Sequence, residues 1–178
     1  TQRYAGIVTR SLTTTLLGRF ALACAVADST IVPLSLVQPC LRSDRRALVN
    51  NSNCRVCFVI PTYNEASNIA PLLQQLVRRD PHVLVLVVDD ESPDGTAEIV
   101  ERMRRDCPRI HLSSGRKEGL GAAYQRGMRV AIDELGADIV VQMDADFSHD
   151  PDDAFTMIAI VEQGADVAIG SRYVQGGS

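Results

Sequence analysis

Two carboxylates separated by one residue follow a short apolar run that is typical of a buried strand. The run is DIVVQM, residues 138–143, and Asp144 and Asp146 come directly after it. Because side chains two residues apart in an extended backbone point to the same side, both carboxylates can reach one cation. A hard divalent ion such as Mg²⁺ or Mn²⁺ turns the repulsion between them into binding and keeps positions open for phosphate oxygens. The pair therefore predicts a metal and diphosphate site.

The acidic residues that follow this pair have a simpler explanation. Asp150, Asp152 and Asp153 surround a proline at a predicted helix start, where acidic side chains suit the helix dipole. A calcium-binding loop is excluded for this stretch, because His149 and Phe155 stand where such a loop needs Gly and Glu. We therefore assign only the first two carboxylates to a site.

Short apolar runs alternate with amphipathic segments throughout the second part of the chain. The apolar runs are rich in β-branched residues and predict strands at 55–60, 83–88, 109–112, 138–143 and 166–169. The amphipathic segments predict helices near 66–79, 95–106, 119–135 and 152–163. Units this short indicate an α/β fold with a parallel-rich sheet and helices on both faces.

The predicted strands all end in polar, Gly-rich or charged loops. In α/β sheets, ligands bind beyond the carboxyl ends of the strands. Turns use the same residue types, but loops of this kind that meet at one edge and carry carboxylates favour a binding site. No G-x-G-x-x-G motif follows the first predicted strand, so the pattern of a dinucleotide-binding fold is absent.

Residues 1–53 show neither helical nor strand periodicity. They carry six Arg against two Asp, and because the net charge of the whole chain is −4, residues 54–178 are strongly acidic, which argues against a nucleic-acid partner. No apolar stretch within them reaches the roughly 18 to 20 residues of a membrane span. We interpret residues 1–53 as a poorly ordered linker, tail or targeting segment. The five Cys lack paired spacing, which favours a reducing, cytoplasmic setting.

Five stretches of residues 54–178 resemble, in order and spacing, the family 2 inverting glycosyltransferases, and in particular the polyprenol-phosphate (dolichol-phosphate) mannosyltransferases. The stretches are VIPTYNEASNI, VVDDESPDGT, RKEGLGAAYQRGM, MDADFSHDP and GSRYVQGG. The resemblance implies a Rossmann-like fold of the glycosyltransferase-A type. It also implies the transfer of mannose from GDP-mannose to a polyprenyl (dolichyl) phosphate with inversion. Residues 54–178 would then be the nucleotide-sugar-binding part of a catalytic domain.

The resemblance implies donor-binding roles for the matching positions. Asp89 and Asp90 would accept hydrogen bonds from the nucleotide base. Gly119 and Gly121 would let the backbone approach the donor beside Lys117. The nucleotide pocket at the first strand end would be formed by Pro61, Tyr63, Asn64 and Glu65.

The resemblance also implies the metal ligands and the acceptor contact. Asp144 and Asp146 match the family's D-x-D motif, which holds Mg²⁺ or Mn²⁺ on the diphosphate. Ser148 stands where some members have Gln as a further metal ligand. Arg172 would face the acceptor phosphate and would complete the catalytic set with the two carboxylates. No catalytic base is expected, because a phosphate monoester oxygen is already anionic at neutral pH.

A polyprenyl phosphate acceptor implies a peripheral position at the cytoplasmic face of a membrane, with an anchoring domain or subunit as a further partner. The family's acceptor loop begins where this sequence stops. We therefore expect a C-terminally truncated fold that binds nucleotide and metal without transferring sugar. Two alternatives stay open: a family 2 enzyme that uses another nucleotide sugar, such as UDP-glucose, and a non-catalytic sugar-nucleotide-binding fragment.

Overall fold

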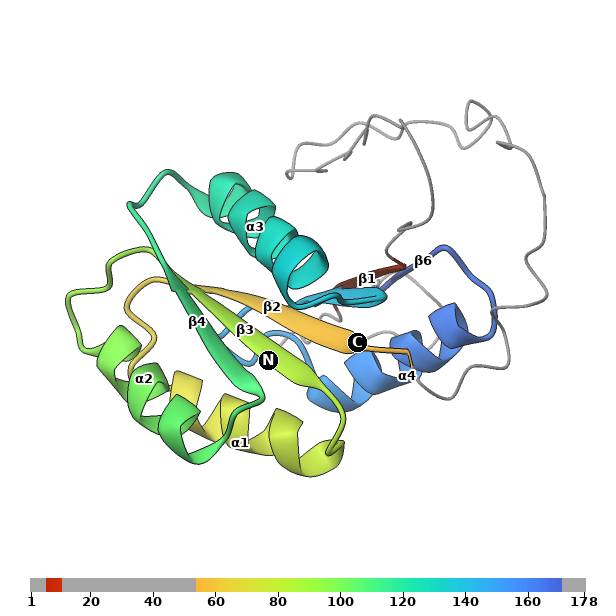
Figure 1. Cartoon of the computed structure of the whole chain (residues 1–178), viewed down its shortest axis with the longest axis horizontal. Helices are drawn as coiled ribbons and strands as arrows, with labels where there is room; N and C mark the ends of the chain where they lie inside the picture. Colours follow the sequence, from red (N-terminus) through yellow and green to blue (C-terminus); the bar gives the residue numbers. More distant parts are fainter. Residues whose placement is uncertain (1–5, 11–53, 171–178) are drawn as a thin grey trace.

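The computed structural model describes residues 6–10 and 54–170, and within them six strands form one sheet (Figure 1). The strand order is β4-β3-β2-β5-β1-β6. Strands β4, β3, β2 and β5 run parallel to one another, whereas β1 runs antiparallel to both β5 and β6. The strands are β1 Ile7–Arg10, β2 Val56–Thr62, β3 Leu84–Asp89, β4 Ile110–Ser114, β5 Ile139–Gln142 and β6 Val167–Ile169.

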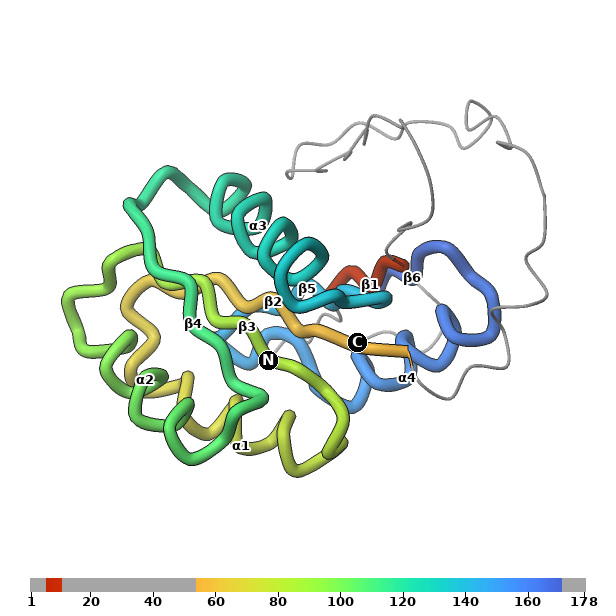
Figure 2. Tube along the Cα trace, in the orientation of Figure 1, coloured from red at the N-terminus to blue at the C-terminus, as the bar shows by residue number. Residues whose placement is uncertain are grey.

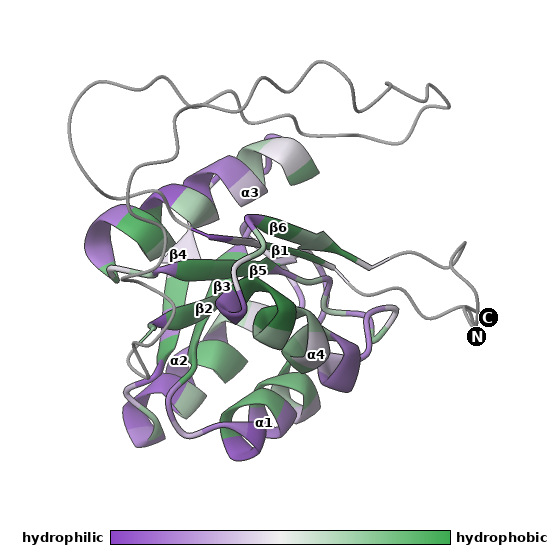
Figure 3. Ribbon diagram, turned by 90° about the vertical axis from the view of Figure 1, so that its right-hand side faces the viewer, coloured by the Kyte–Doolittle hydropathy of each residue, from purple (hydrophilic) through white to green (hydrophobic). Residues whose placement is uncertain are grey.

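Helices cover both faces of the sheet. Figures 1 and 3 show α3 on one face and α1, α2 and α4 on the other. The helices are α1 Ile69–Arg79, α2 Thr96–Asp106, α3 Leu120–Arg129, which continues into the π-helical turn η2 Val130–Glu134, and α4 Pro151–Glu162. The α/β fold with a parallel-rich sheet and helices on both faces, predicted from the sequence, is confirmed.

Two apolar layers pack on the two faces of the sheet, because successive side chains of a strand point to opposite sides. In β2, Phe58 and Ile60 join the layer under α1 and α4, while Cys57 and Val59 join the layer under α3. Strands β2, β3 and β5 are accordingly apolar along most of their length (Figure 3). Each such strand buries both faces, as parallel strands do.

Helix α3 lies unusually close to the sheet because of a glycine. A Cβ atom at Gly127 would lie 2.7 Å from Val88 Cγ2 and would also collide with Val59 Cγ1. Real Cβ contacts do not approach so closely, so only glycine allows the helix to sit at this height. The closeness of α3 brings its side chains within reach of the strand ends.

Strand β1 was not predicted from the sequence. It lies within residues 1–53 and inserts between β5 and β6, as Figure 2 shows. Its register pairs Val8 with Val141 of β5 and with Ala168 of β6, and Val8 is fully buried. Its sequence is IVTR, in which only Ile7 and Val8 are apolar, so it lacks the apolar run that marks the predicted strands.

The described helices include none whose length and hydropathy would suit a passage through a bilayer. The remainder of residues 1–53, and residues 171–178, lie outside the described part of the chain.

Candidate functional site

A cavity of about 310 Å³ lies at the carboxyl ends of β2, β3 and β5, where the sequence predicted a site. Its walls come from the loops after these strands, from the loop between β4 and α3, and from the first turn of α3. The structure brings together eight of the predicted site residues in this cavity: Pro61, Tyr63, Glu65, Asp90, Lys117, Gly119, Asp144 and Asp146. Thr62, Leu120, Ala123 and Ala145 complete the lining.

The other predicted site residues that the structure describes do not line this cavity. Asn64 is exposed, adopts a left-handed backbone with φ of 63°, and donates its backbone N–H to Ser92 Oγ. Gly121 lies in the first turn of α3, where a Cβ atom would meet nothing within 4 Å. Ser148 lies beside Asp146. Arg172 lies outside the described residues.

The two adjacent carboxylates after β3 have different surroundings. Asp89 is 0% exposed, and its oxygens accept hydrogen bonds from Thr62 Oγ1, Ser92 N–H and Ser92 Oγ at 3.0, 2.9 and 2.6 Å. Asp90 is 6% exposed but lines the cavity, and its Oδ1 atom accepts from Arg126 Nη2 at 2.6 Å. Asp89 therefore shapes the turn from inside the protein, and Asp90 is the one that a ligand can reach.

The first carboxylate after β5 is held by two side chains. Tyr124 Oη donates to Asp144 Oδ1 at 2.9 Å. The backbone N–H of Asp144 donates to His149 Nδ1 at 3.0 Å, so this histidine acts as an acceptor and anchors the backbone. The Asp144 side chain remains 42% exposed. The carboxylate is therefore oriented by the protein and still open to the cavity.

The second carboxylate after β5 lies further out. Asp146 is exposed, and its Oδ1 atom accepts the backbone N–H of Ser148 at 2.9 Å. Hydrogen bonding from Ser148 lowers the pKa of Asp146 below its ordinary value. Asp146 is therefore ionised at neutral pH and can act as a metal ligand.

The donor atoms of this pair suit a hard divalent metal. No cluster of three His, Cys, Asp or Glu side chains that could hold a metal is found in residues 6–10 and 54–170. Mg²⁺ and Mn²⁺ are often bound through one or two carboxylates, with water and substrate phosphates as the other ligands. Asp144 and Asp146 fit such an ion, because both line the cavity and both present oxygen atoms.

An aromatic ring and an ammonium group form another wall of the cavity. Tyr63 is 42% exposed, and Lys117 Nζ lies 3.2 Å from the centroid of its ring. Such a ring can stack on a planar ligand, and the ammonium can meet an anionic one. Glu65 lies beside them and accepts from Asn68 Nδ2 at 2.8 Å, which fixes the carboxylate at the start of α1.

The loops after β2 and β3 are joined by Asp94. Its Oδ2 atom accepts the backbone N–H of Ala66 at 2.9 Å, and its Oδ1 atom accepts from Thr96 Oγ1 at 2.6 Å. These hydrogen bonds lower the pKa of Asp94, and the bond from Thr96 contributes most. Asp94 Oδ1 also accepts the backbone N–H of Thr96, the first residue of α2, at 3.1 Å.

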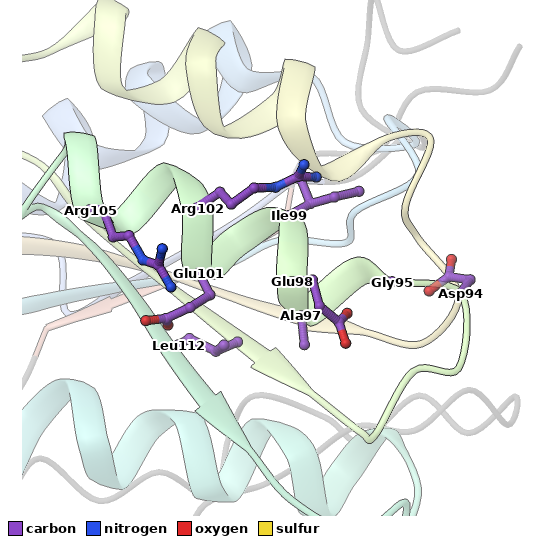
Figure 4. A pocket seen from close by; sticks show the side chains of 9 residues that line it. All are labelled: Asp94, Gly95, Ala97, Glu98, Ile99, Glu101, Arg102, Arg105 and Leu112. Atoms are coloured by element: carbon purple, nitrogen blue, oxygen red, sulfur yellow. The ribbon is translucent and has the colours of Figure 1, made fainter.

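Two larger hollows lie away from the strand ends. One, of about 630 Å³, is formed by the outer surface of α2 and by Leu112 of β4 (Figure 4). The other, of about 660 Å³, lies between α1 and the start of α4. Both are lined mainly by helix-surface residues and gather none of the predicted site residues, so the smaller cavity remains the candidate site.

Two residues near the site were not predicted from the sequence. Tyr124 and Arg126 of α3 contact Asp144 and Asp90, although neither lines the cavity. In the sequence, Tyr124 belongs to the apolar stripe of a predicted helix, which describes its burial but not its hydroxyl contact. No local pattern marks contacts between residues so far apart in the chain.

Comparison with known proteins finds similarity to one enzyme family. Residues 57–178 match the family model of glycosyl transferase family 2. The chain is 42% identical over 126 residues to polyprenol monophosphomannose synthase of Mycolicibacterium smegmatis, a match that covers 70% of this chain and 47% of that protein. It is 44% identical over 124 residues to undecaprenyl-phosphate mannosyltransferase of Micrococcus luteus, which covers 69% of this chain and 50% of that protein. The chain thus spans about half the length of these curated relatives.

A solved structure supports the fold. The chain resembles mannosyl-3-phosphoglycerate synthase from Rubrobacter xylanophilus with a TM-score of 0.52 and 25% sequence identity, over 62% of this chain and 37% of that one. This likeness agrees with the Rossmann-like fold of the glycosyltransferase-A type that the sequence predicted.

Proposed function

This chain belongs to glycosyl transferase family 2, and on that premise we propose that it forms the donor-binding part of an enzyme that transfers mannose from GDP-mannose to a polyprenyl phosphate. The names of the two relatives, a polyprenol monophosphomannose synthase and an undecaprenyl-phosphate mannosyltransferase, support this substrate pair. The observation that carries the proposal is the cavity at the strand ends, because eight of the residues expected to bind the donor and its metal line it together.

In the proposed complex, the nucleoside occupies the end of the cavity near β2 and β3. The exposed face of Tyr63 suits a planar base. The Asp90 carboxylate, and that of Glu65, accept hydrogen bonds from the base or ribose hydroxyls. Asp89 shapes this end of the cavity from inside the protein, because its oxygens already accept hydrogen bonds from Thr62 and Ser92.

The diphosphate occupies the end of the cavity near β5. Asp144 and Asp146 hold Mg²⁺ or Mn²⁺ there, with Ser148 as a further candidate ligand, and Lys117 faces the phosphates. The metal, when bound, stabilises the charge that grows on GDP as it leaves. Gly119 leaves room for close approach of the donor, since a Cβ atom there would meet nothing within 4 Å.

The acceptor needs orientation more than activation. A phosphate oxygen of polyprenyl phosphate is already anionic, so it attacks the anomeric carbon without a general base and inverts the configuration. The proposed acceptor contact is Arg172, whose guanidinium fork suits a phosphate. An acceptor of this kind places the enzyme at the cytoplasmic face of a membrane, with an anchoring domain or subunit among its partners.

The test is a calorimetric titration of the chain with GDP-mannose and with UDP-glucose, each with and without Mn²⁺. We expect GDP-mannose to bind more tightly than UDP-glucose, and Mn²⁺ to strengthen its binding. Asp144→Asn should remove the effect of Mn²⁺, whereas Asp153→Asn, an exposed acidic residue of α4 outside the cavity, should keep it. Preference for UDP-glucose would establish the alternative donor instead, and absence of any nucleotide binding would contradict the proposal.

A further inference from the structure

Helix α3 contributes Leu120 and Ala123 to the cavity lining and also contacts a carboxylate at each end of the cavity. Its Tyr124 contacts the carboxylate after β5, and its Arg126 contacts the carboxylate after β3. Strands β3 and β5 lie on either side of β2, and α3 packs on β2 and β3 at the short distance that Gly127 permits. One helix therefore touches both acidic positions that the proposed function assigns to the donor.

The contact of Arg126 with Asp90 is short and largely enclosed. Nη2 lies 2.6 Å from Asp90 Oδ1, and the two side chains are 26% and 8% exposed. The guanidinium also packs on Gly115, where an added Cβ atom would lie 3.0 Å from Cζ and Nη1. Arg126 thus joins the end of β3 to the loop that carries Lys117.

The Arg126 contact is poorly explained as a device for stability. The Nε atom of Arg126 is buried and has no hydrogen-bond partner among the described residues. An unsatisfied buried donor is costly, and a hydrophobic pair often serves a fold as well as an enclosed ion pair does. A role in holding the Asp90 carboxylate at the cavity wall explains the presence of Arg126 better than a contribution to fold stability does.

The contact of Tyr124 with Asp144 fixes a metal-binding carboxylate. The ring is buried in the apolar layer under α3, and the hydroxyl donates to Oδ1 at 2.9 Å. The opposite side of Asp144 is anchored by the backbone bond to His149. Partners of this kind, which orient a ligand without touching the metal, contribute strongly to metal affinity.

We propose that α3 is a positioning helix for the donor site: Tyr124 orients Asp144 for the metal, and Arg126 orients Asp90 for the nucleoside. This inference rests on the proposed function for the identity of the ligands. Neither side chain touches the donor, so each acts through the carboxylate that it holds. The two contacts are therefore separable, one by metal affinity and the other by nucleotide affinity without metal.

The metal arm is tested with Tyr124→Phe, which removes one hydroxyl and keeps the ring. Mn²⁺ affinity, measured by electron paramagnetic resonance in the presence of GDP, should fall about tenfold to a hundredfold. GDP affinity in EDTA should stay within twofold of the wild type. Gln125→Ala, an exposed position on the same helix, is the matched control and should change neither.

The nucleoside arm is tested with Arg126→Gln. GDP affinity in EDTA, measured by calorimetry, should fall about tenfold or more, as for a lost charge-assisted hydrogen bond. The strengthening of GDP binding by Mn²⁺ should be retained. Arg126→Lys, which keeps the charge and loses the planar fork, should recover part of the affinity and covers the case in which the first variant does not fold. Arg129→Gln, an exposed arginine of the same helix, is the control.

The results that would contradict the positioning inference differ from those that would contradict the proposed function. Wild-type affinities for Mn²⁺ and GDP in both α3 variants would overturn the positioning inference and leave the proposed function standing. Equal losses of metal and nucleotide affinity in each variant, with a lower melting temperature, would also overturn it, because a merely structural helix has that effect. Wild-type protein that binds neither GDP nor Mn²⁺ would contradict the proposed function and, with it, this inference.

Discussion

The acidic residues at the two ends of the cavity differ in what their oxygens contact. After β3, Asp89 and Asp90 are 0% and 6% exposed and accept hydrogen bonds from protein groups. After β5, the Asp144 side chain is 42% exposed and Asp146 is exposed. In the first pair, Asp89 is satisfied by protein groups and Asp90 lines the cavity with one oxygen bound to Arg126, whereas the second pair exposes more of its oxygen surface to a ligand. Carboxylates of one type and one location in the sheet can therefore have opposite physical roles.

This difference predicts opposite costs of substitution. Removing a buried carboxylate leaves its hydrogen-bond donors without a partner and destabilises the fold. Removing an exposed carboxylate beside another one relieves like-charge repulsion and leaves the fold intact. Stability measurements should separate the two ends before any ligand is added.

The largest effect is expected for Asp89→Ala. The variant loses three hydrogen bonds at a buried site, from Thr62 and Ser92, and we expect its free energy of unfolding to fall by about 3 kcal/mol. Urea unfolding followed by circular dichroism measures this change. A loss below about 0.5 kcal/mol would show that the buried end of the cavity does not depend on Asp89.

A smaller effect, on binding alone, is expected for Asp146→Asn. Replacing one of two metal ligands should reduce the gain in GDP affinity caused by Mn²⁺ by about 2 kcal/mol, while the melting temperature stays unchanged or rises slightly. Calorimetry with and without Mn²⁺ measures the first quantity and thermal unfolding the second. A drop of several degrees with the Mn²⁺ effect preserved would make Asp146 a structural residue and remove the contrast between the two ends.

The smallest effect concerns pH and the joining residue Asp94. Its pKa lies below the ordinary value of 3.8, chiefly because Thr96 donates a hydrogen bond to it. A carboxyl group whose pKa is lower in the folded protein than in the unfolded chain stabilises the fold at pH values above its unfolded pKa. This contribution is lost as the pH falls through the folded pKa. The stability difference between wild type and Asp94→Asn should therefore be constant from pH 7 to pH 5 and shrink below about pH 4. A difference that changes between pH 7 and pH 5 in urea unfolding would contradict this assignment.

The sequence predicted the strand and helix order of residues 54–170 because local patterns determine it. Alternating apolar runs and amphipathic segments mark the elements, and the crossover rules then give a parallel-rich sheet. Strand β1 was missed because IVTR has only two apolar residues, and its place between β5 and β6 depends on contacts with distant parts of the chain. Antiparallel pairing at this side of the sheet follows from β1 and was missed with it.

The candidate site was predicted where residue type at a strand end was enough. Asp89 and Asp90 were treated alike, although neighbouring residues in extended backbone point in opposite directions, and that alternation could have separated the buried carboxylate from the accessible one. Tyr124 and Arg126 could not be found in this way. Their contacts depend on the height of α3 above the sheet, which Gly127 sets through packing.

The location of β1 also bears on the order in which the chain acquires its fold. The pairings β2–β3 and β3–β4 join strands that follow each other along the chain, whereas β1 pairs with β5 and β6 at the other end of the described chain. Closing so long a loop costs entropy before the contacts form, so this pairing is slow. Although β1 is synthesised before its partners, we expect it to dock last. In refolding followed by pulsed hydrogen exchange, amides shared by β1 and β5 should gain protection after those of β2 and β3.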